Sequence, residues 1–338
     1  MLDGPDSQAL DYANRVNSMH TESPQGTCVL PLETIPCPAC GEQEEYKQVA
    51  KRRDGLAIVR CRCGLAFVNP RPTAEAIPEM YANYYCGGQG AATGYVAYAP
   101  TIQSLQTSYP WGWELIAKRA TLRGARTLDI GCAYGKMVYW MHRAGARATG
   151  IDLLPDGVRW GHGHGLDLRV GTLDDLAGDE QFDVVTLMDV IEHIPDLSGF
   201  MAKLGKIMKP GGLVMVQTPN FGAYRGPRSI HLHTSLEHLL YFEAASLDGL
   251  LRRHGFEPVT PTSAYCVIPT ELPEREISPP VSGLRAVMKR LPVFARLVQV
   301  KRRFFPLGNR YSEDATKTAG STIVGIYRPT LPIAGGEV

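Results

Sequence analysis

The segment LDIGCAYGKM, residues 128–137, combines a carboxylate with two glycines at the junction of an expected strand and helix. Gly131 and Gly135 allow the backbone to pass close to a ligand, while the helix N-terminus presents free amide hydrogens. Asp129, at the end of the strand, would face a cationic part of that ligand. Because dinucleotide-binding folds and simple tight turns also use such glycines, the turn needs support from other residues.

Two further groups follow at the expected ends of the next strands. Asp152, in GID, is placed to accept hydrogen bonds from both hydroxyls of a ribose. Thr172, Leu173 and Asp174, in GTLDDL, lie where an adenine ring could be flanked and its amino group bonded. Singly, Asp152 could be a helix cap and Leu173 a core residue. Their order along the chain favours a nucleoside site.

The fourth strand ends in MDVIEHIPD, which places Met188, Asp189 and His193 at the carboxyl edge of the sheet, where such sheets bind ligands. Chemistry on a hydroxyl acceptor needs a base to take up the proton, and histidine has the most suitable pKa. His193 is one candidate for this base. Alternatively, it is a structural histidine at a helix end whose ring hydrogen-bonds to the backbone. An amine acceptor would need no base.

Three more histidines lie in RGPRSIHLHTSLEHLLYF, after the fifth expected strand. His231 and His233 are the favoured candidates for the base, because substrate loops gather on this side of the sheet. His238 is a third candidate, although it could equally serve as a cap or packing residue.

Four cysteines form two pairs at metal-ligand spacing, Cys37-x2-Cys40 and Cys61-x-Cys63. Four thiolates suit tetrahedral zinc, and because they leave no open position the metal would be structural. The second pair is one residue shorter than the usual knuckle. Free buried cysteines are the alternative.

Two other features have both a functional and a structural interpretation. Tyr81, Tyr84 and Tyr85 could form an aromatic wall for an acceptor, but such a stripe more often packs a helix. The insertion at 270–317 contains a basic amphipathic stretch, 281–305, which is either a solvated face or a contact for a phosphate-bearing acceptor or an anionic membrane surface.

From Arg126 onward, strand-like and helix-like segments alternate regularly, which predicts parallel βαβ units and a doubly wound α/β sheet. The strand-like segment STIVGIYR near the end would close the sheet. The expected organisation is a loose tail at 1–34, a four-cysteine zinc-binding module at 35–72, a helical connector or substrate cap at 73–124, and a catalytic domain at 125–330.

Global composition adds little specificity. With 35 basic and 34 acidic residues the net charge is close to zero, which argues against nucleic acid as the main partner. No apolar run reaches the ~18 residues that span a bilayer, and the N-terminal residues lack the pattern of a signal peptide. We therefore expect a cytoplasmic location.

The set LDIGCAYG, GID, FDVVTLMDVIEHIPD and KPGGLVMVQTPN resembles the class I S-adenosylmethionine-dependent methyltransferases, within them the large group with the DVIEH signature. The resemblance covers residues 126–330 in order and implies a seven-stranded, Rossmann-like sheet. It implies that Asp129, Gly131 and Gly135 hold the methionine part of the cofactor. It places the rest of the cofactor among Cys132, Ala133, Tyr134, Asp152, Leu153, Thr172, Leu173, Asp174, Met188 and Asp189. Ala133 departs from the group, which has a glycine there.

The Cys-rich module resembles the N-terminal zinc-binding element of some methyltransferases that act on nucleotide-linked sugars and secondary metabolites, where CG followed by NPRP recurs. This resemblance implies a small-molecule acceptor, foremost a hydroxyl of a sugar, glycan precursor or secondary metabolite. C- or N-methylation of a nucleotide-linked sugar and modification of RNA through the basic Cys-rich module stay open as alternatives. A nicotinamide-dependent dehydrogenase would not explain DVIEHIPD together with KPGG.

Overall fold

The structure, a computed structural model, describes residues 31–52, 54–77, 105–106, 110, 112–223, 237–265 and 322–330. Several sequence predictions therefore lie outside the described residues. These predictions concern most of the expected tail, the tyrosines Tyr81, Tyr84 and Tyr85, the loop histidines His231 and His233, and the basic insertion at 270–317.

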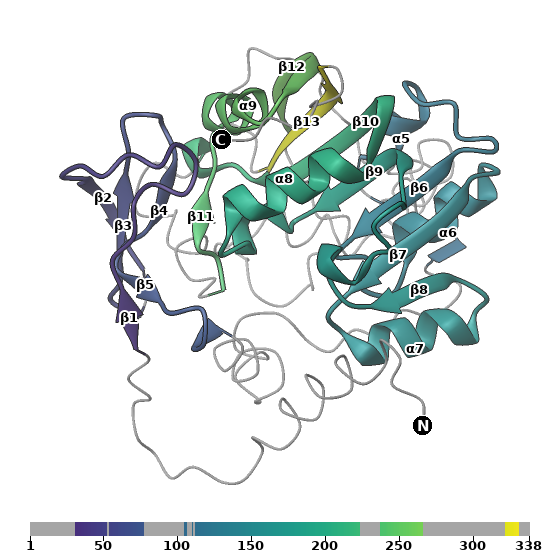
Figure 1. Cartoon of the computed structure of the whole chain (residues 1–338), viewed down its shortest axis with the longest axis horizontal. Coiled ribbons are helices and arrows are strands. Elements are labelled where there is room, and N and C mark those ends of the chain that lie inside the picture. The colour runs from purple at the N-terminus through teal and green to yellow at the C-terminus, as the bar shows by residue number, and fades with distance from the viewer. Residues whose placement is uncertain are drawn as a thin grey trace, which may run out of the picture.

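A seven-stranded sheet forms the centre of the molecule (Figure 1). Its order is β12-β13-β10-β9-β6-β7-β8, and β13 runs antiparallel to both of its neighbours while the other strands are parallel. The strands are β6 (Arg126–Ile130), β7 (Arg147–Asp152), β8 (Asp167–Val170), β9 (Phe182–Met188), β10 (Met208–Pro219), β12 (Phe256–Tyr265) and β13 (Thr322–Pro329). This order confirms the predicted Rossmann-like methyltransferase sheet.

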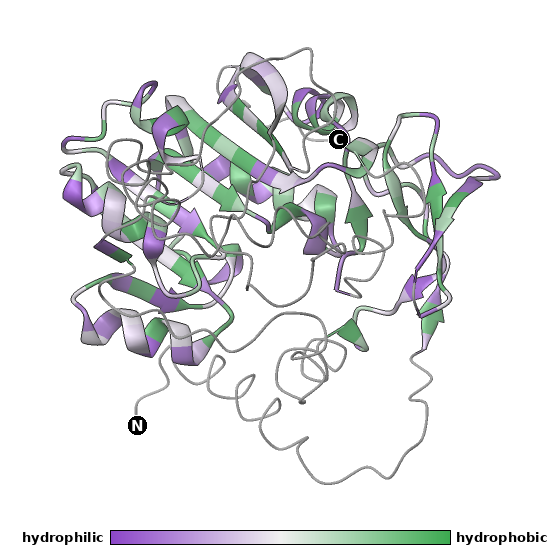
Figure 2. Ribbon diagram, turned by 180° about the vertical axis from the view of Figure 1, so that it is seen from behind, coloured by the Kyte–Doolittle hydropathy of each residue, from purple (hydrophilic) through white to green (hydrophobic). Residues whose placement is uncertain are grey.

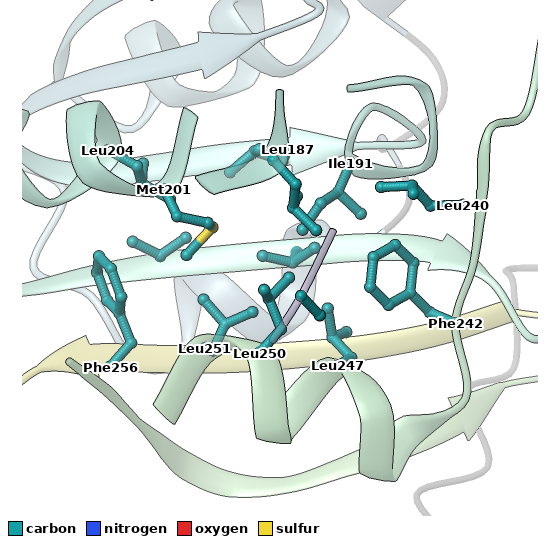
Figure 3. Close-up of a cluster of buried hydrophobic side chains, with 14 of the residues drawn as sticks. Leu187, Ile191, Met201, Leu204, Leu240, Phe242, Leu247, Leu250, Leu251 and Phe256 are labelled. Atoms are coloured by element: carbon teal, nitrogen blue, oxygen red, sulfur yellow. The ribbon is translucent and has the colours of Figure 1, made fainter. Parts of the chain in front are cut away.

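Helices cover both faces of this sheet, as the alternating pattern predicted. One face packs against α5 (Trp113–Ala117), α6 (Lys136–Arg143) and α7 (Pro155–Gly163). The opposite face packs against α8 (Leu197–Ile207) and α9 (Ala244–Arg253), and Figure 3 shows their leucines meeting Leu187 of β9. The central strands are apolar along most of their length because both of their faces are buried (Figure 2).

Short 3-10 helices and loops connect these elements at the carboxyl edge of the sheet. They are η2 (Leu173–Asp175), η3 (Ile191–His193) and η4 (Phe221–Ala223). None of the helices in the described ranges combines the length and the apolarity that crossing a bilayer requires.

The Cys-rich region folds as strands β2 (Lys47–Lys51), β3 (Ala57–Arg60) and β4 (Ala66–Val68), which pair antiparallel. A fourth strand, β11 (Leu240–Tyr241), joins them from a distant part of the sequence. A separate pair, β1 (Leu32–Glu33) with β5 (Arg71–Pro72), brackets the region. The sequence predicted a four-cysteine module at 35–72, and the structure shows that the sheet of this region is completed by a strand from the catalytic half of the chain.

The two parts also share one hydrophobic core. Phe67 of β4, which is fully buried, belongs to the same buried cluster as Leu187 of β9 and Leu250 of α9. The Cys-rich region therefore packs on the α8/α9 side of the main sheet.

Candidate cofactor and acceptor site

The loop after β6 is attached to the end of β7 by three backbone amides. Gly131 N–H and Cys132 N–H both donate to the carbonyl oxygen of Ile151, at 2.9 and 3.1 Å. Ala133 N–H donates to Oδ2 of Asp152 at 2.7 Å. Since β6 and β7 are parallel neighbours, these bonds hold the glycine-rich loop over the carboxyl edge of the sheet.

Close approaches explain why glycines occupy this loop and the helix beside it. A Cβ on Gly131, which has φ +71°, would lie 2.4 Å from Cγ2 of Val190. A Cβ on Gly157 of α7 would lie 2.7 Å from the carbonyl oxygen of Ala133, so the helix can pack this closely only through glycine. Ala133 itself has φ 47°, a left-handed conformation that costs an L-residue about 1 kcal/mol. The alanine in place of the family's glycine is therefore accommodated with strain.

Asp129 lies at the end of β6 and is buried, with 4% of its surface exposed. Its Oδ1 accepts a hydrogen bond from Oγ1 of Thr186 on β9 at 2.6 Å. Burial raises the pKa of Asp129 to about 7, and the nearby carboxylate of Asp152 adds to the rise. A cationic ligand beside Asp129 would favour its ionised form.

Both carboxylate oxygens of Asp152 accept backbone hydrogen bonds, one from Ala133 and the other from Leu154 at 2.8 Å. Each oxygen keeps a further lone pair, so the carboxylate can still accept bonds from ligand hydroxyls. Burial raises the pKa of Asp152 despite the amide donors, which lower it. Asp152 thus serves the local backbone as well as any ligand.

The segment expected beside adenine forms η2. Thr172 caps it by accepting from Asp174 N–H at 3.1 Å, and Leu173 is buried at 8% exposure. The carboxylate of Asp174, which the sequence assigned to the adenine amino group, forms an ion pair with Lys203 of α8.

The remaining residues of the expected cofactor site differ in exposure and in their packing partners. Leu153 is half exposed, and Tyr134 packs edge-on against Trp160, with ring centroids 5.7 Å apart. Cys132 is buried, and a Cβ on Gly150 would lie 2.7 Å from its Sγ, so the thiol packs under the loop. Gly135, with φ +82°, precedes α6 as its N-cap.

Met188 and Asp189 end β9 beside β10. Oδ2 of Asp189 accepts from Nε2 of Gln217 at 3.0 Å, and Asp189 adopts φ 55°, a left-handed conformation that aspartate tolerates better than most residues. Surrounding protein atoms raise the pKa of Asp189 to about 6, although its side chain reaches solvent.

Two histidines from separate segments meet next to this edge. The rings of His193 in η3 and His238 before β11 are 4.7 Å apart and nearly perpendicular. Burial lowers the pKa of His193 to about 4 and lowers that of His238 well below its usual range. Both imidazoles are therefore neutral at pH 7 and can ligate a metal, and the same burial makes each a weaker base than an exposed histidine.

The sequence interpretation missed Glu192, which adjoins the two histidines. It is 1% exposed, its Oε2 accepts from Oγ1 of Thr218 at 2.9 Å, and its Oε1 has no hydrogen-bond partner among the described residues. Burial raises its pKa well above the usual value. The ligand atoms of Glu192, His193 and His238 lie within 4.8 Å of one another, so one cation could contact all three. The only signal in the sequence was a carboxylate within the apolar run VIEHI.

The four cysteines converge as their spacing predicted. The Sγ atoms of Cys37 and Cys63 are 3.6 Å apart, as are those of Cys40 and Cys61. Zn–S bonds of about 2.3 Å in a tetrahedron require sulfur separations of about 3.8 Å. Burial raises the pKa of Cys37 to about 12, so a thiolate there requires a compensating cation. The donor set and geometry therefore fit zinc, even with the shortened second pair.

Part of the chain is similar in sequence to known methyltransferases. Residues 111–260 match the sequence profile of a methyltransferase domain family. The ubiquinone biosynthesis O-methyltransferase of Xanthomonas oryzae pv. oryzae is 38% identical over 115 residues, which cover 32% of this chain and 48% of that protein. The Xylella fastidiosa protein of the same name is 36% identical, over 32% of this chain and 47% of its own length. The chain spans about half the length of these curated relatives.

Solved structures with similar chains are also methyltransferases. The 1,6-didemethyltoxoflavin-N1-methyltransferase of Burkholderia thailandensis aligns with a TM-score of 0.46 at 17% identity, over 85% of this chain and all of that one. An S-adenosylmethionine-dependent methyltransferase of Mesorhizobium loti aligns with a TM-score of 0.43 at 17% identity, over 66% of this chain and 99% of its own. The profile match places a methyltransferase domain at residues 111–260, and the strand order is that of a Rossmann-like methyltransferase sheet.

The raised pKa of Asp129 predicts a specific dependence of stability on pH. The folded protein binds a proton at Asp129 more tightly than the unfolded chain, so stability falls as pH rises from about 4 to 7 and then levels off. Asp129→Asn removes this ionisation and keeps an acceptor for Thr186. The variant should gain on the order of 2 kcal/mol relative to wild type between about pH 5 and pH 8. Denaturant unfolding of both proteins at about pH 5 and pH 8 measures the stability difference between variant and wild type. If that difference is the same at the two pH values, the raised pKa of Asp129 is contradicted.

Proposed function

We propose that this protein transfers a methyl group from S-adenosylmethionine to a small-molecule acceptor, at a hydroxyl of a sugar, glycan precursor or secondary metabolite. The observation that carries the proposal is the attachment of the glycine-rich loop to Asp152 beside Asp129. This arrangement offers a carboxylate for the cofactor's amino group, a second for its ribose, and Leu173 for its adenine. Relatives named as O-methyltransferases support an oxygen acceptor.

The bound cofactor would supply an electrophilic methyl group on a sulfonium sulfur. The residues of this chain then have two tasks, which are to align the acceptor oxygen with that methyl and to take up its proton. His193 and His238 are candidates for the second task because their rings meet beside the edge where β9 ends. Burial lowers the pKa of both imidazoles and makes each a weaker base than an exposed histidine, so the role rests on their position. In such a transfer the carbon–sulfur electrons would stay on sulfur, and the role of this chain would be to receive the hydroxyl proton at an imidazole nitrogen. His231 and His233 remain candidates for the same role.

We further propose that Cys37, Cys40, Cys61 and Cys63 bind one structural zinc ion. The paired sulfur separations of 3.6 Å support this assignment. With four thiolates the ion would have no open position for substrate, so it would stabilise the Cys-rich region and take no part in chemistry. The proposed domains are this region at 35–72, a connector at 73–124 and the catalytic domain at 125–330.

The proposed cofactor site predicts a large effect of Asp152→Ala on affinity for S-adenosylhomocysteine. Loss of a carboxylate that accepts from two ribose hydroxyls should cost about 2 to 4 kcal/mol, or ~30-fold or more in Kd. Isothermal titration calorimetry measures it. Asp156→Ala, a matched change at an exposed residue of α7, should leave Kd unchanged. Equal affinity of Asp152→Ala and wild type would refute the cofactor site.

The zinc assignment predicts one zinc ion per purified chain, measured by elemental analysis. Cys40→Ser should lose the ion and destabilise the protein, because metal binding contributes to folding free energy. Cys132→Ser, at a cysteine outside the cluster, should retain it. Stable wild-type protein that contains no metal would contradict the proposal.

The proton acceptor is tested by replacing each candidate histidine with alanine. The variant that removes the base should lower turnover by ~100- to 10,000-fold while the Kd for S-adenosylhomocysteine stays nearly constant, since the residue acts only on the acceptor. His142→Ala, on the exposed side of α6, is the control. Acceptors to screen include UDP-glucose and 3,4-dihydroxybenzoate, with release of S-adenosylhomocysteine as the readout. If all four variants keep full turnover, no histidine is the base.

A further inference from the structure

The segment from Glu237 to Phe242 is held from two sides. On one side, β11 pairs with β4 of the Cys-rich region, and Val68 N–H donates to the carbonyl oxygen of Leu239 at 2.9 Å. On the other side, Leu239 N–H donates to the carbonyl oxygen of Glu192 at 2.9 Å. This segment, residues 237–242, therefore links the Cys-rich region to η3 of the catalytic half (Figure 1).

One buried arginine of the Cys-rich region reaches into this link. Arg52, which follows β2, is 3% exposed, and its Nη1 donates to the carbonyl oxygen of His238 at 2.9 Å. The rest of its guanidinium binds Asp54, through Nε at 3.2 Å and through a second, shorter contact. Burying a charge is costly unless it is paired and fully hydrogen-bonded. Asp54 supplies the opposite charge, and the His238 carbonyl supplies a buried acceptor for Nη1 of Arg52.

The peptide that Arg52 holds carries one of the two clustered imidazoles. His238 is 9% exposed and its ring lies edge-on to His193. The other imidazole depends on the same segment, because Nδ1 of His193 lies 3.2 Å from the carbonyl oxygen of Glu237. A shift of the backbone at 237–239 would therefore move His238 directly and would remove a hydrogen-bond partner of His193.

A second contact restrains the far end of the segment. Arg60 of β3 forms an ion pair with Glu243 at 2.6 Å, and its guanidinium lies 5.5 Å from the ring centroid of Phe221. This pair is partly exposed, so its contribution is small compared with the buried contact of Arg52. The Cys-rich region thus contacts the segment and its C-terminal neighbour Glu243 at three places, and Arg52 provides the buried side-chain contact among them.

We propose that the Cys-rich region is a positioning element of the acceptor site, and that Arg52, through the His238 carbonyl, fixes the His193–His238 pair for methyl transfer. The proposal rests on the function proposed above. Arg52 touches neither substrate nor cofactor, so it acts through the backbone of residue 238. The proposal gives the Cys-rich region a role in turnover, in addition to that of a structural appendage.

Arg52→Met tests the proposal, because methionine keeps an apolar stem and removes all the guanidinium donors. Misplacing a reacting group by about 1 Å lowers rates by up to ~100-fold, so kcat should fall by ~10- to 100-fold. The Kd for S-adenosylhomocysteine and the KM for the acceptor should stay within about twofold of wild type. Arg52→Lys, which can still donate to the carbonyl, should recover part of kcat. Arg62→Met, a matched change at an exposed arginine of the same region, should behave as wild type.

Reactivity of His238 toward diethyl pyrocarbonate gives a readout that needs no acceptor. In Arg52→Met, release of the 237–239 backbone should raise the rate of modification of His238 several-fold, as seen by peptide mass spectrometry. Arg62→Met should leave that rate unchanged. This measurement separates the two proposals, because a wild-type protein without any methyl transfer refutes the function while the labelling still reports on Arg52.

Each outcome decides the proposal. A lower kcat at constant cofactor affinity, with faster labelling of His238, supports it. Unchanged kcat, unchanged labelling, or a parallel loss of kcat and cofactor affinity would overturn it. If Arg52→Met does not fold, Asp54→Asn is read by the same criteria, since it loosens the guanidinium from its partly exposed side.

Discussion

The hydrogen bond from Ala133 N–H to the Asp152 carboxylate is the contact on which the proposed cofactor site depends. It joins the loop after β6 to the end of β7, and Gly157 lets α7 approach the same loop within contact distance of the Ala133 carbonyl. Two carboxylates, Asp129 and Asp152, are thereby held in a region where burial raises their pKa. Ionising both is unfavourable until a cation or hydroxyl donors arrive, which is what a sulfonium nucleoside with a free amino group provides.

A second constraint is the core that the Cys-rich region shares with the catalytic half. Phe67 packs in the same cluster as residues of β9 and α9, and β11 completes the sheet of β2, β3 and β4. Because the backbone of residues 237–242 bonds to both parts, the His193–His238 pair is positioned by elements that are far apart in sequence. The four-cysteine cluster and the His193–His238 pair thus lie in parts of the chain that one backbone segment connects, although four cysteine ligands would keep a bound ion away from the chemistry.

Local patterns were sufficient to predict the strands and helices of the main sheet, because hydrophobic residues recur with a different period in strands and in helices. The glycine-rich loop and the cysteine pairs could also be predicted, because their residues follow fixed spacings. Contacts between distant segments could not be predicted. Strand β11 has two residues and no periodicity, and the bond from Arg52 to His238 spans 186 positions. The ion pair of Asp174 with Lys203 of α8 had no sequence signal, and the only sign of the buried Glu192 was its place in the apolar run VIEHI. Side-chain roles set by tertiary packing therefore require the structure.

A crystal structure of the complex with S-adenosylhomocysteine tests the account most directly. The account predicts the homocysteine amine beside Asp129, the ribose hydroxyls at Asp152 and the adenine against Leu173. The sulfur should then face the space next to His193 and His238. A ligand bound elsewhere on the chain, or bound at this edge with its ribose away from Asp152, would contradict it.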